Sequence, residues 1–109
     1  MGVADGAKKF RNHVLAMGLI REFCRAHPDM QDAPDVLTKF FKELETRRFN
    51  RWDDVRRAFG SASHVGRSVV FNVGGNKYRV VADIKYGKAR IYLTHVLTHE
   101  EYDRGYWKR

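Results

Sequence analysis

The apolar residues of this chain change their spacing near residue 60, and that change constrains the fold more than any other feature. Before it, apolar residues recur at intervals of three and four, which predicts amphipathic helices. From residue 68 they alternate with polar residues around glycine-containing turns, which predicts antiparallel strands. We expect an α+β fold in which two to three N-terminal helices pack on one face of a small, mainly antiparallel β-sheet. With 109 residues, the chain is predicted to have a flexible arm over residues 1–12 and a single domain over 13–109.

Local patterns place the N-terminal elements. Residues 13–16 are compatible with a short strand, and an apolar face over residues 19–24 predicts a helix that Pro28 ends. A second helix is expected over residues 36–48, with Asp35 as its N-cap. A third is expected over residues 51–59, with Asn50 as its N-cap and Asp53 at the third helical position. Residues 60–63 have the composition of a loop.

Glycines mark the turns of the sheet, and alternation separates its two faces. A hairpin with a two-residue loop is predicted at Gly74-Gly75 or at Gly75-Asn76, and a second turn at residues 86–88. The face toward the helices is expected to hold Phe71, Val73, Tyr78, Val80, Ala82, Ile84, Ile91, Leu93 and Leu97. The opposite face is expected to hold Asn72, Lys77, Arg79, Asp83, Arg90, Tyr92 and Thr94.

The positive charge of the chain indicates an anionic partner. Lys and Arg number 21 against 13 Asp and Glu, which gives a formal net charge of +8. Cations spaced by two along neighbouring strands would offer a phosphodiester several donors on one sheet face. A second group, Arg47, Arg48 and Arg51, begins an arginine-rich segment that could contact a nucleic-acid backbone in a salt-dependent way. The sheet face can also be interpreted as a solvated surface, and the arginine-rich segment as a solvated helix surface with partial ion pairing.

Composition disfavours several other classes of protein. No apolar run approaches the roughly 18 residues of a membrane-spanning helix, and residues 1–12 lack the apolar centre of a signal peptide. The single cysteine, Cys24, cannot form an internal disulfide. Its place on an apolar helix face predicts a buried small side chain rather than a nucleophile. We expect a cytoplasmic protein without a membrane role or a small-molecule cofactor.

A short polar motif, Thr-His-Glu-Glu-Tyr-Asp, follows the last predicted strand. In a helical turn His99 and Tyr102 would lie on one side, and an imidazole can exchange protons near neutral pH. The same residues match a capping box, with Thr98 as N-cap and Glu101 at the third helical position. The motif is therefore compatible with a helix start, with proton transfer, or with both.

The spacing of His95, His99 and Asp103 could bind zinc on a continuous helix. The strand predicted at His95 would instead point the two imidazole rings apart. We therefore expect no metal site.

Two stretches together resemble a known family. VVFNVGGNKYRVVADIKY, followed by ARIYLTHVLTHEEYDRGYW, is similar to the HigB toxins of type II toxin–antitoxin systems, which belong to the RelE-like ribonuclease superfamily. Upstream, VLAMGLIREFCRAHPD resembles the family's first strand and helix, and WDDVRRAFGSASHVG resembles the stretch before its hairpin. The resemblance covers roughly residues 13–105 and implies a RelE-like α+β fold.

The resemblance also implies an activity and partners. The activity is that of an mRNA interferase, a metal-independent endoribonuclease that cleaves mRNA on the translating ribosome and inhibits translation and growth. The partners are a HigA-like helix-turn-helix antitoxin, and mRNA together with the RNA of the ribosome.

Candidate roles follow from this resemblance and from the chemistry of RNA cleavage. Attack of a 2′-hydroxyl on the adjacent phosphate needs a base, an acid and a cation for the developing charge, but no metal. Arg79 is expected to stabilise the phosphate, and Lys77 to assist or to act as the base. His99 and Tyr102 are expected to transfer protons, although Tyr102 could instead stack on a nucleobase. Candidate RNA-binding residues are Asn72, Arg90, Tyr92, Thr94, Asp103, Arg47, Arg48 and Arg51.

One position departs from the family pattern. Many relatives carry Arg in the last strand where this chain has Thr94, so Arg90 or another cation would have to substitute, or activity would be weaker. Two alternatives to an active toxin remain open. One is a non-catalytic basic RNA-binding module, and the other is a decayed toxin that only binds its antitoxin and regulates its operon.

Overall fold

A computed structural model of the chain describes residues 13–16 and 18–108, so the predicted arm over residues 1–12 lies outside the described part. Five strands form one sheet in the order β1-β5-β4-β3-β2. β1 pairs in parallel with β5, and the other neighbours are antiparallel. The elements are β1 (His13–Leu15), α2 (Leu19–Ala26), α3 (Ala33–Glu45), α4 (Trp52–Ala58), β2 (Ser63–Val65), β3 (Ser68–Val73), β4 (Tyr78–Lys85), β5 (Arg90–Thr98), α5 (His99–Arg104) and the 3₁₀ helix η1 (Tyr106–Lys108).

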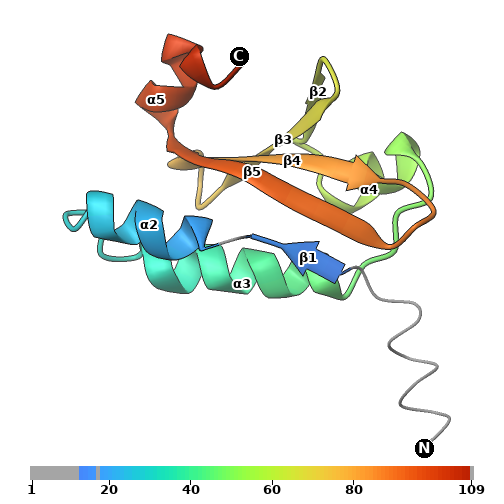
Figure 1. Ribbon diagram of the computed structural model, residues 1–109, viewed down its shortest axis with the longest axis horizontal. Coiled ribbons are helices and arrows are strands. Elements are labelled where there is room, and N and C mark those ends of the chain that lie inside the picture. The colour runs from blue at the N-terminus through green and yellow to red at the C-terminus, as the bar shows by residue number, and fades with distance from the viewer. Residues whose placement is uncertain (1–12, 17, 109) are drawn as a thin grey trace, which may run out of the picture.

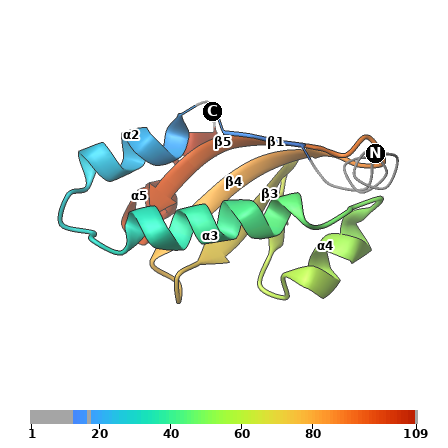
Figure 2. The same ribbon diagram turned by 90° about the horizontal axis from the view of Figure 1, so that it is seen from below.

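The helices lie on both sides of this sheet, but unequally. α2 and α3 lie along one face, whereas α5 and the C-terminal turn lie on the other (Figure 1). Seen from below, α3 crosses the strands diagonally and α4 lies beside the far end of the sheet (Figure 2). The predicted α+β class is confirmed, with the N-terminal helices on one face. Within the described ranges, no helix is long and apolar enough to cross a membrane.

The main core lies between this helical layer and the sheet. Its helical side includes Phe23, Leu37, Phe40 and Leu44, and its sheet side includes Val69, Phe71, Val80, Ala82, Ile91 and Leu93. Aromatic side chains join the two layers, since the ring of Phe40 meets that of Phe71 edge-on at a centroid distance of 5.2 Å. Burial of these side chains gives the sheet a fixed inner face, and each strand therefore has a defined outer face.

One predicted helix start was wrong by three residues and another by one. α3 begins at Ala33 rather than residue 36, because Pro34 occupies the first turn, where a missing N–H costs nothing. It ends at Glu45, so Arg47 and Arg48 lie beyond it. α4 begins at Trp52, and Asp54 rather than Asp53 closes its first turn. The Asp54 carboxylate accepts hydrogen bonds from the backbone N–H groups of residues 50 and 51, at 2.9 and 3.3 Å.

The hairpin between β3 and β4 forms at the second of the two predicted positions. Gly75 and Asn76 have φ angles of 63° and 75°, and the N–H of Lys77 donates to the carbonyl of Gly74. Gly74 also has a positive φ, of 65°, and the ladder ends at the pair of Val73 and Tyr78, so the loop spans residues 74–77 with its tight turn at Gly75-Asn76. Asn72 therefore pairs with Arg79 across the ladder. Alternation did not predict β2, the edge strand that Ser63 begins.

A β-bulge in β5 overturns part of the predicted face assignment. Val81 pairs with His95 and Ala82 pairs with Leu93, so Thr94 is an extra residue without a partner in β4. The bulge reverses the alternation beyond it, which places Val96 in the main core. Leu97, expected in that core, instead lies on the outer face, where it pairs with Arg79.

The outer face of the sheet is also less polar than predicted. Val70 and Val81 are buried there under Trp107, and they form a second, small apolar cluster. The partly buried residues packed against it are Val65, Leu97 and Tyr102. The C-terminal turn thus covers one part of this face, and the candidate site lies at the edge of the covered area.

Candidate active site

Arg79 is the centre of the candidate site. Only 8% of it is exposed, and it is the single buried polar or charged residue in the described part of the chain. Its Nη1 donates to the carbonyl oxygens of Asn76 and Tyr78, at 3.0 and 3.3 Å, and its Nη2 lies 3.2 Å from Nδ1 of His99. Buried charges are normally paired with an opposite charge. Among the described residues, no carboxylate forms an ion pair with Arg79, so no ion pair within this part of the chain neutralises its positive charge.

His99 is oriented by two neighbours. Because a guanidinium can only donate, Nδ1 of His99 accepts from Arg79, and the neutral imidazole then carries its proton on Nε2. Nε2 lies 3.6 Å from the Oδ2 of Asp103, one helical turn later. The side chains of His99 and Asp103 are 57% and 60% exposed. A row of Arg79, His99 and Asp103 therefore leads from the buried cation to the surface, and its outer two members are open to a substrate.

Tyr102 lies between Arg79 and Trp107. The Arg79 guanidinium lies 5.6 Å from the centre of the Tyr102 ring, and the Trp107 ring stacks on Tyr102 at 5.0 Å. Trp107 is fixed in turn because its Nε1 donates to the carbonyl of Tyr102 at 2.9 Å. Since both faces of the Tyr102 ring are covered, the edge with the hydroxyl is the part that can meet a substrate. Of the two predicted roles, proton transfer therefore fits this geometry better than stacking on a nucleobase.

The capping box predicted at Thr98 and Glu101 is confirmed, and it explains why the motif folds as it does. The hydroxyl of Thr98 accepts from the N–H of Glu101 at 3.1 Å, and the Glu101 carboxylate accepts from the N–H of Thr98 at 2.9 Å. These two bonds start α5 directly where β5 ends. His99 thereby becomes the first residue of the helix, next to the strand that carries Arg79.

Lys77 does not join this group, contrary to the expectation that it lies beside Arg79 on the outer face. It lies in the hairpin turn, and its Nζ is 2.7 Å from Oδ2 of Asp32, just before α3. The hydroxyl of Tyr78 donates to the other oxygen of the same carboxylate. The hydrogen bond from Lys77, followed by that from Tyr78, lowers the pKa of Asp32. The turn thus ties Lys77 to the helical layer.

The other predicted sheet residues are spread along the outer face. Asn72 is half-buried and lies directly across the ladder from Arg79. Arg90 and Tyr92 are on the same face but at the start of β5, so Arg90 is about 26 Å along the strand from its other end at Thr98. Thr94 is exposed at the bulge, where its hydroxyl donates to the carbonyl of Val81 at 3.2 Å. Of these four residues, only Asn72 adjoins the site.

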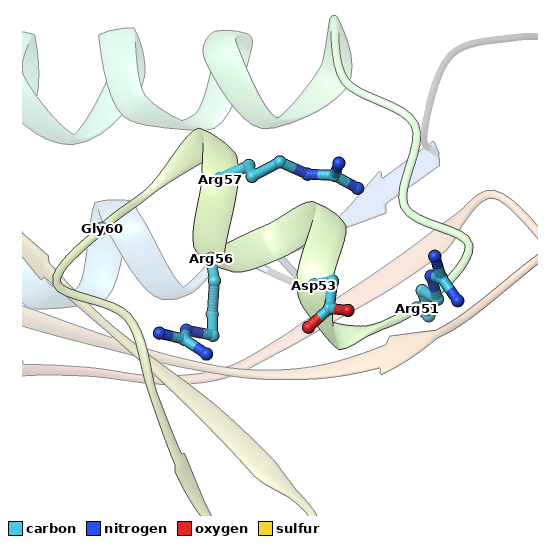
Figure 3. Close-up of a pocket in the computed structure, with 5 residues that line it drawn as sticks. All are labelled: Arg51, Asp53, Arg56, Arg57 and Gly60. Atoms are coloured by element: carbon cyan, nitrogen blue, oxygen red, sulfur yellow. The ribbon is translucent and has the colours of Figure 1, made fainter.

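The arginine-rich segment forms a separate surface at the α4 end of the molecule. Arg51, Arg56 and Arg57 line a shallow pocket with Asp53 and Gly60 (Figure 3). Arg57 pairs with Asp54 at 2.7 Å, and Arg47 lies 4.0 Å from Glu43. Arg48 donates to the carbonyl of Gly87 at 3.3 Å. The prediction of partial ion pairing is thus correct, and α4 and α5 lie at opposite ends of the sheet (Figures 1 and 2).

In the described residues, no three His, Cys, Asp or Glu side chains are placed to hold a metal ion together. His95 does not approach His99, because it pairs with Val81 in the sheet and its ring meets Trp107 edge-on. Cys24 is half-buried and packs against the main core, at a groove between α2 and α3.

Sequence patterns missed three contributors to the site. Trp107 was not singled out, yet it supports Tyr102. Gly105, whose φ is 79°, turns the chain back after α5, and a glycine just after a predicted helix was the pattern that could have revealed it. His27, at the end of α2, lies 3.2 Å from Glu101. No local pattern links residues that lie so far apart in the chain.

The fold and the site define a class of protein: a small α+β domain that presents a buried arginine, an imidazole and a phenol on the open face of its sheet. The model of the HigB toxin family, RelE-like toxic components of toxin–antitoxin systems, matches residues 33–105. The chain belongs to this family.

Individual relatives agree with this assignment. The mRNA interferase HigB of Escherichia coli O6:H1 is 28% identical over 95 residues, which cover 84% of this chain and 89% of the relative. The mRNA interferase toxin HigB of Escherichia coli K12 is 36% identical over 58 residues, which cover 50% of this chain and 56% of the relative. The mRNA interferase HigB of Shigella flexneri matches to the same extent.

Proposed function

We propose that this toxin is a metal-independent endoribonuclease that cleaves mRNA on the translating ribosome. Arg79 carries the proposal, because a buried guanidinium without a carboxylate partner, in contact with an imidazole, suits a phosphate that gains negative charge. The names of the relatives, mRNA interferases, support the same substrate. The protein thereby inhibits translation and growth until its antitoxin binds.

In the proposed reaction, the 2′-hydroxyl oxygen attacks the adjacent phosphorus and the bond from phosphorus to the 5′ oxygen breaks. The products are a 2′,3′-cyclic phosphate and a 5′-hydroxyl. One proton leaves the 2′-hydroxyl for a base, and one reaches the departing 5′ oxygen from an acid. No metal is needed, since the nucleophile belongs to the RNA.

The contact between Arg79 and His99 suggests how the phosphate prepares the site. Without RNA, Nδ1 of His99 is occupied by Nη2 of Arg79. A phosphate that takes over this donor releases Nδ1, and the imidazole can then accept and return a proton. Asp103, beside Nε2, stabilises the imidazolium that forms. The hydroxyl of Tyr102 is the second proton-transfer group, and Lys77 supports the site only through its turn.

The arginines around α4 give the RNA a second contact. Arg47, Arg48 and Arg51, in the segment just before α4, can hold phosphates, and α4 lies at the opposite end of the sheet from α5 (Figure 1), which suits an extended RNA or the RNA of the ribosome. Asn72 contacts the RNA next to Arg79, whereas Arg90, Tyr92 and Thr94 contact nucleotides farther along β5. A HigA-like antitoxin with a helix-turn-helix is the protein partner.

The test compares Arg79→Ala, His99→Ala and Tyr102→Phe with wild type under tightly controlled expression. Growth is followed, and cleavage of a translated mRNA is mapped in a cell-free translation system. Arg79→Ala should lower the cleavage rate by about 10²–10³, because one stabiliser of the developing charge is removed. Arg25→Ala, an exposed arginine of α2, is the matched control and should leave the rate unchanged.

The outcomes separate the alternatives. A wild-type protein that binds RNA in a salt-sensitive way without cleaving it is a binding module. One that binds its antitoxin but neither cleaves RNA nor slows growth is a decayed toxin, and Thr94 in place of the common Arg is the first position to examine. A His99→Ala variant as active as wild type would remove only the role of His99.

A further inference from the structure

α5 carries two of the candidate catalytic residues, yet it buries none of its own residues. His99 and Tyr102 therefore do not gain their positions from the main core. Tyr102 packs against the small apolar cluster of the outer face, and the N–H of His99 donates to the carbonyl of Lys77 at 3.2 Å. The distance of His99 and Tyr102 from Arg79 depends on these contacts and on any further contact that holds α5 to the rest of the molecule. Any residue that fixes α5 to a rigid element consequently controls the geometry of the site.

One such contact joins α5 to the end of α2. Nε2 of His27 lies 3.2 Å from Oε2 of Glu101, a residue between His99 and Tyr102 in the chain. The two side chains are 21% and 34% exposed, so the contact is partly shielded from water. It spans 74 residues of sequence and connects the helical layer to the outer side of the sheet.

The His27 ring is itself fixed to the core. Its Nδ1 lies 2.9 Å from the carbonyl oxygen of Phe23, and its ring stacks on that of Phe23 at 4.2 Å. Phe23 is 5% exposed and meets the ring of Tyr78 edge-on at 5.7 Å. His27 therefore presents Nε2 to Glu101 from a position that core packing determines.

Glu101 divides its carboxylate between two partners. Oε1 accepts from the N–H of Thr98 at the start of α5, and Oε2 faces His27. Both groups that face the His27 ring, the Phe23 carbonyl and the Glu101 carboxylate, are acceptors. The two ring nitrogens of His27 thus lie between these acceptors, one on the side of the core and one on the side of α5.

We propose that His27 and Glu101 form a positioning pair that holds α5 so that His99 and Tyr102 face Arg79. The inference rests on the proposed function because that proposal assigns the reaction to His99, Tyr102 and Arg79. Neither member of the pair touches the reacting atoms. Loss of the pair should lower kcat with little change in KM, because small displacements of catalytic groups reduce rates strongly.

Two substitutions at one position test the pair. In His27→Asn the amide can reach the Phe23 carbonyl in place of Nδ1, but nothing reaches Glu101. In His27→Gln the longer amide places a donor where Nε2 was. A role confined to stacking on Phe23 would be lost equally in both variants, whereas a positioning role should be rescued by Gln. His64→Asn, a histidine of β2 away from α5, is the control.

The first measurement needs no RNA. Amide hydrogen exchange over residues 99–104 and the NMR shifts of the His99 ring report the position of α5 in the full chain. We expect His27→Asn to speed this exchange about tenfold and to lower kcat for mRNA cleavage about tenfold, and His27→Gln to stay within about twofold of wild type in both. Equal values for the two variants, or unchanged exchange in His27→Asn, would overturn the proposal.

A replacement variant and the cleavage activity of wild type keep failure of this proposal distinct from failure of the proposed function. If His27→Asn does not fold by circular dichroism, His27→Leu replaces it, since an apolar side chain of similar length can pack on Phe23 but gives Glu101 no hydrogen-bond partner. Faster exchange then supports the pair, and unchanged exchange contradicts it. Should wild type not cleave mRNA at all, the proposed function fails, while the exchange data still decide whether the pair positions α5.

Discussion

At the scale of single residues, the hydroxyls of Tyr78, in β4, and of Tyr86, just after β4, differ in their hydrogen bonding. The hydroxyl of Tyr78 donates to Asp32, whereas the buried hydroxyl of Tyr86 has no hydrogen-bond partner in the described part of the chain. Burial, with the bond to Asp32, raises the pKa of Tyr78 to about 12. Burial alone raises the pKa of Tyr86. The same substitution should therefore have different effects at the two positions.

Tyr78→Phe should lower the free energy of unfolding by about 1 kcal/mol at pH 7, because Asp32 loses a donor. Tyr86→Phe should leave it unchanged or raise it slightly, since an unsatisfied hydroxyl is removed. Urea unfolding of both variants measures the difference.

The dependence of folding stability on pH tests the role of the Tyr78 hydroxyl a second time. A raised pKa means that the folded protein keeps the proton longer than the unfolded chain, so this contribution is complete below pH 10 and is lost as the pH rises toward about 12. Tyr78→Phe should make the loss of stability over that range less steep than in wild type. An equally steep loss would contradict the assigned bond.

At the scale of elements, the bulge at Thr94 decides which side chains of β5 face the core. Val96 is 9% exposed in the main core, and Leu97 is half-buried on the outer face. Val96→Ser should therefore destabilise the protein by about 2 kcal/mol, and Leu97→Ser by about half as much. Thermal and urea unfolding compare the two. A larger cost at Leu97 would indicate a regular strand without the bulge.

The same element shows how far sequence patterns could predict the fold and the site. The capping box at Thr98 and Glu101 was predicted correctly because its two bonds connect residues three apart. The Gly75-Asn76 turn is equally local. The position of Leu97 was missed because a bulge depends on pairing with β4 rather than on the strand's own alternation. Patterns of this kind predict elements, not their irregularities.

The sequence predicted only part of the site, because local patterns do not detect contacts between residues that lie far apart in the chain. Arg79, His99 and Tyr102 do converge, because adjacent strands and the helix that follows bring them together. Lys77 was assigned to this group, but it pairs with Asp32, 45 residues earlier in the chain. The link from His27 to Glu101 is equally distant in sequence. Contacts that cross from the helical layer to the sheet need three-dimensional information.

At the scale of the whole molecule, the two groups of cations proposed to bind RNA, the Arg79 site and the arginines around α4, lie apart. If both bind RNA, substitutions of the arginines around α4 should weaken RNA binding without changing the rate of cleavage. Arg51→Ala combined with Arg56→Ala should weaken binding of single-stranded RNA, while kcat stays unchanged. The slope of log affinity against log salt concentration should fall by roughly 0.7 for each phosphate that the variant no longer neutralises. Fluorescence anisotropy over a range of salt concentrations measures the slope, with Arg25→Ala as the control.

The parallel pairing of the first described strand with the last has a consequence for the biosynthesis of the protein. β1 ends at Leu15, and its partner β5 begins only at Arg90. During synthesis the N-terminal helices therefore emerge before the strand that joins β1 to β4 in the sheet, and long-range pairing of this kind forms slowly. His99 follows β5 directly, so a nascent chain has no assembled site. The order of the strands thus delays activity until β5 and α5 have been synthesised.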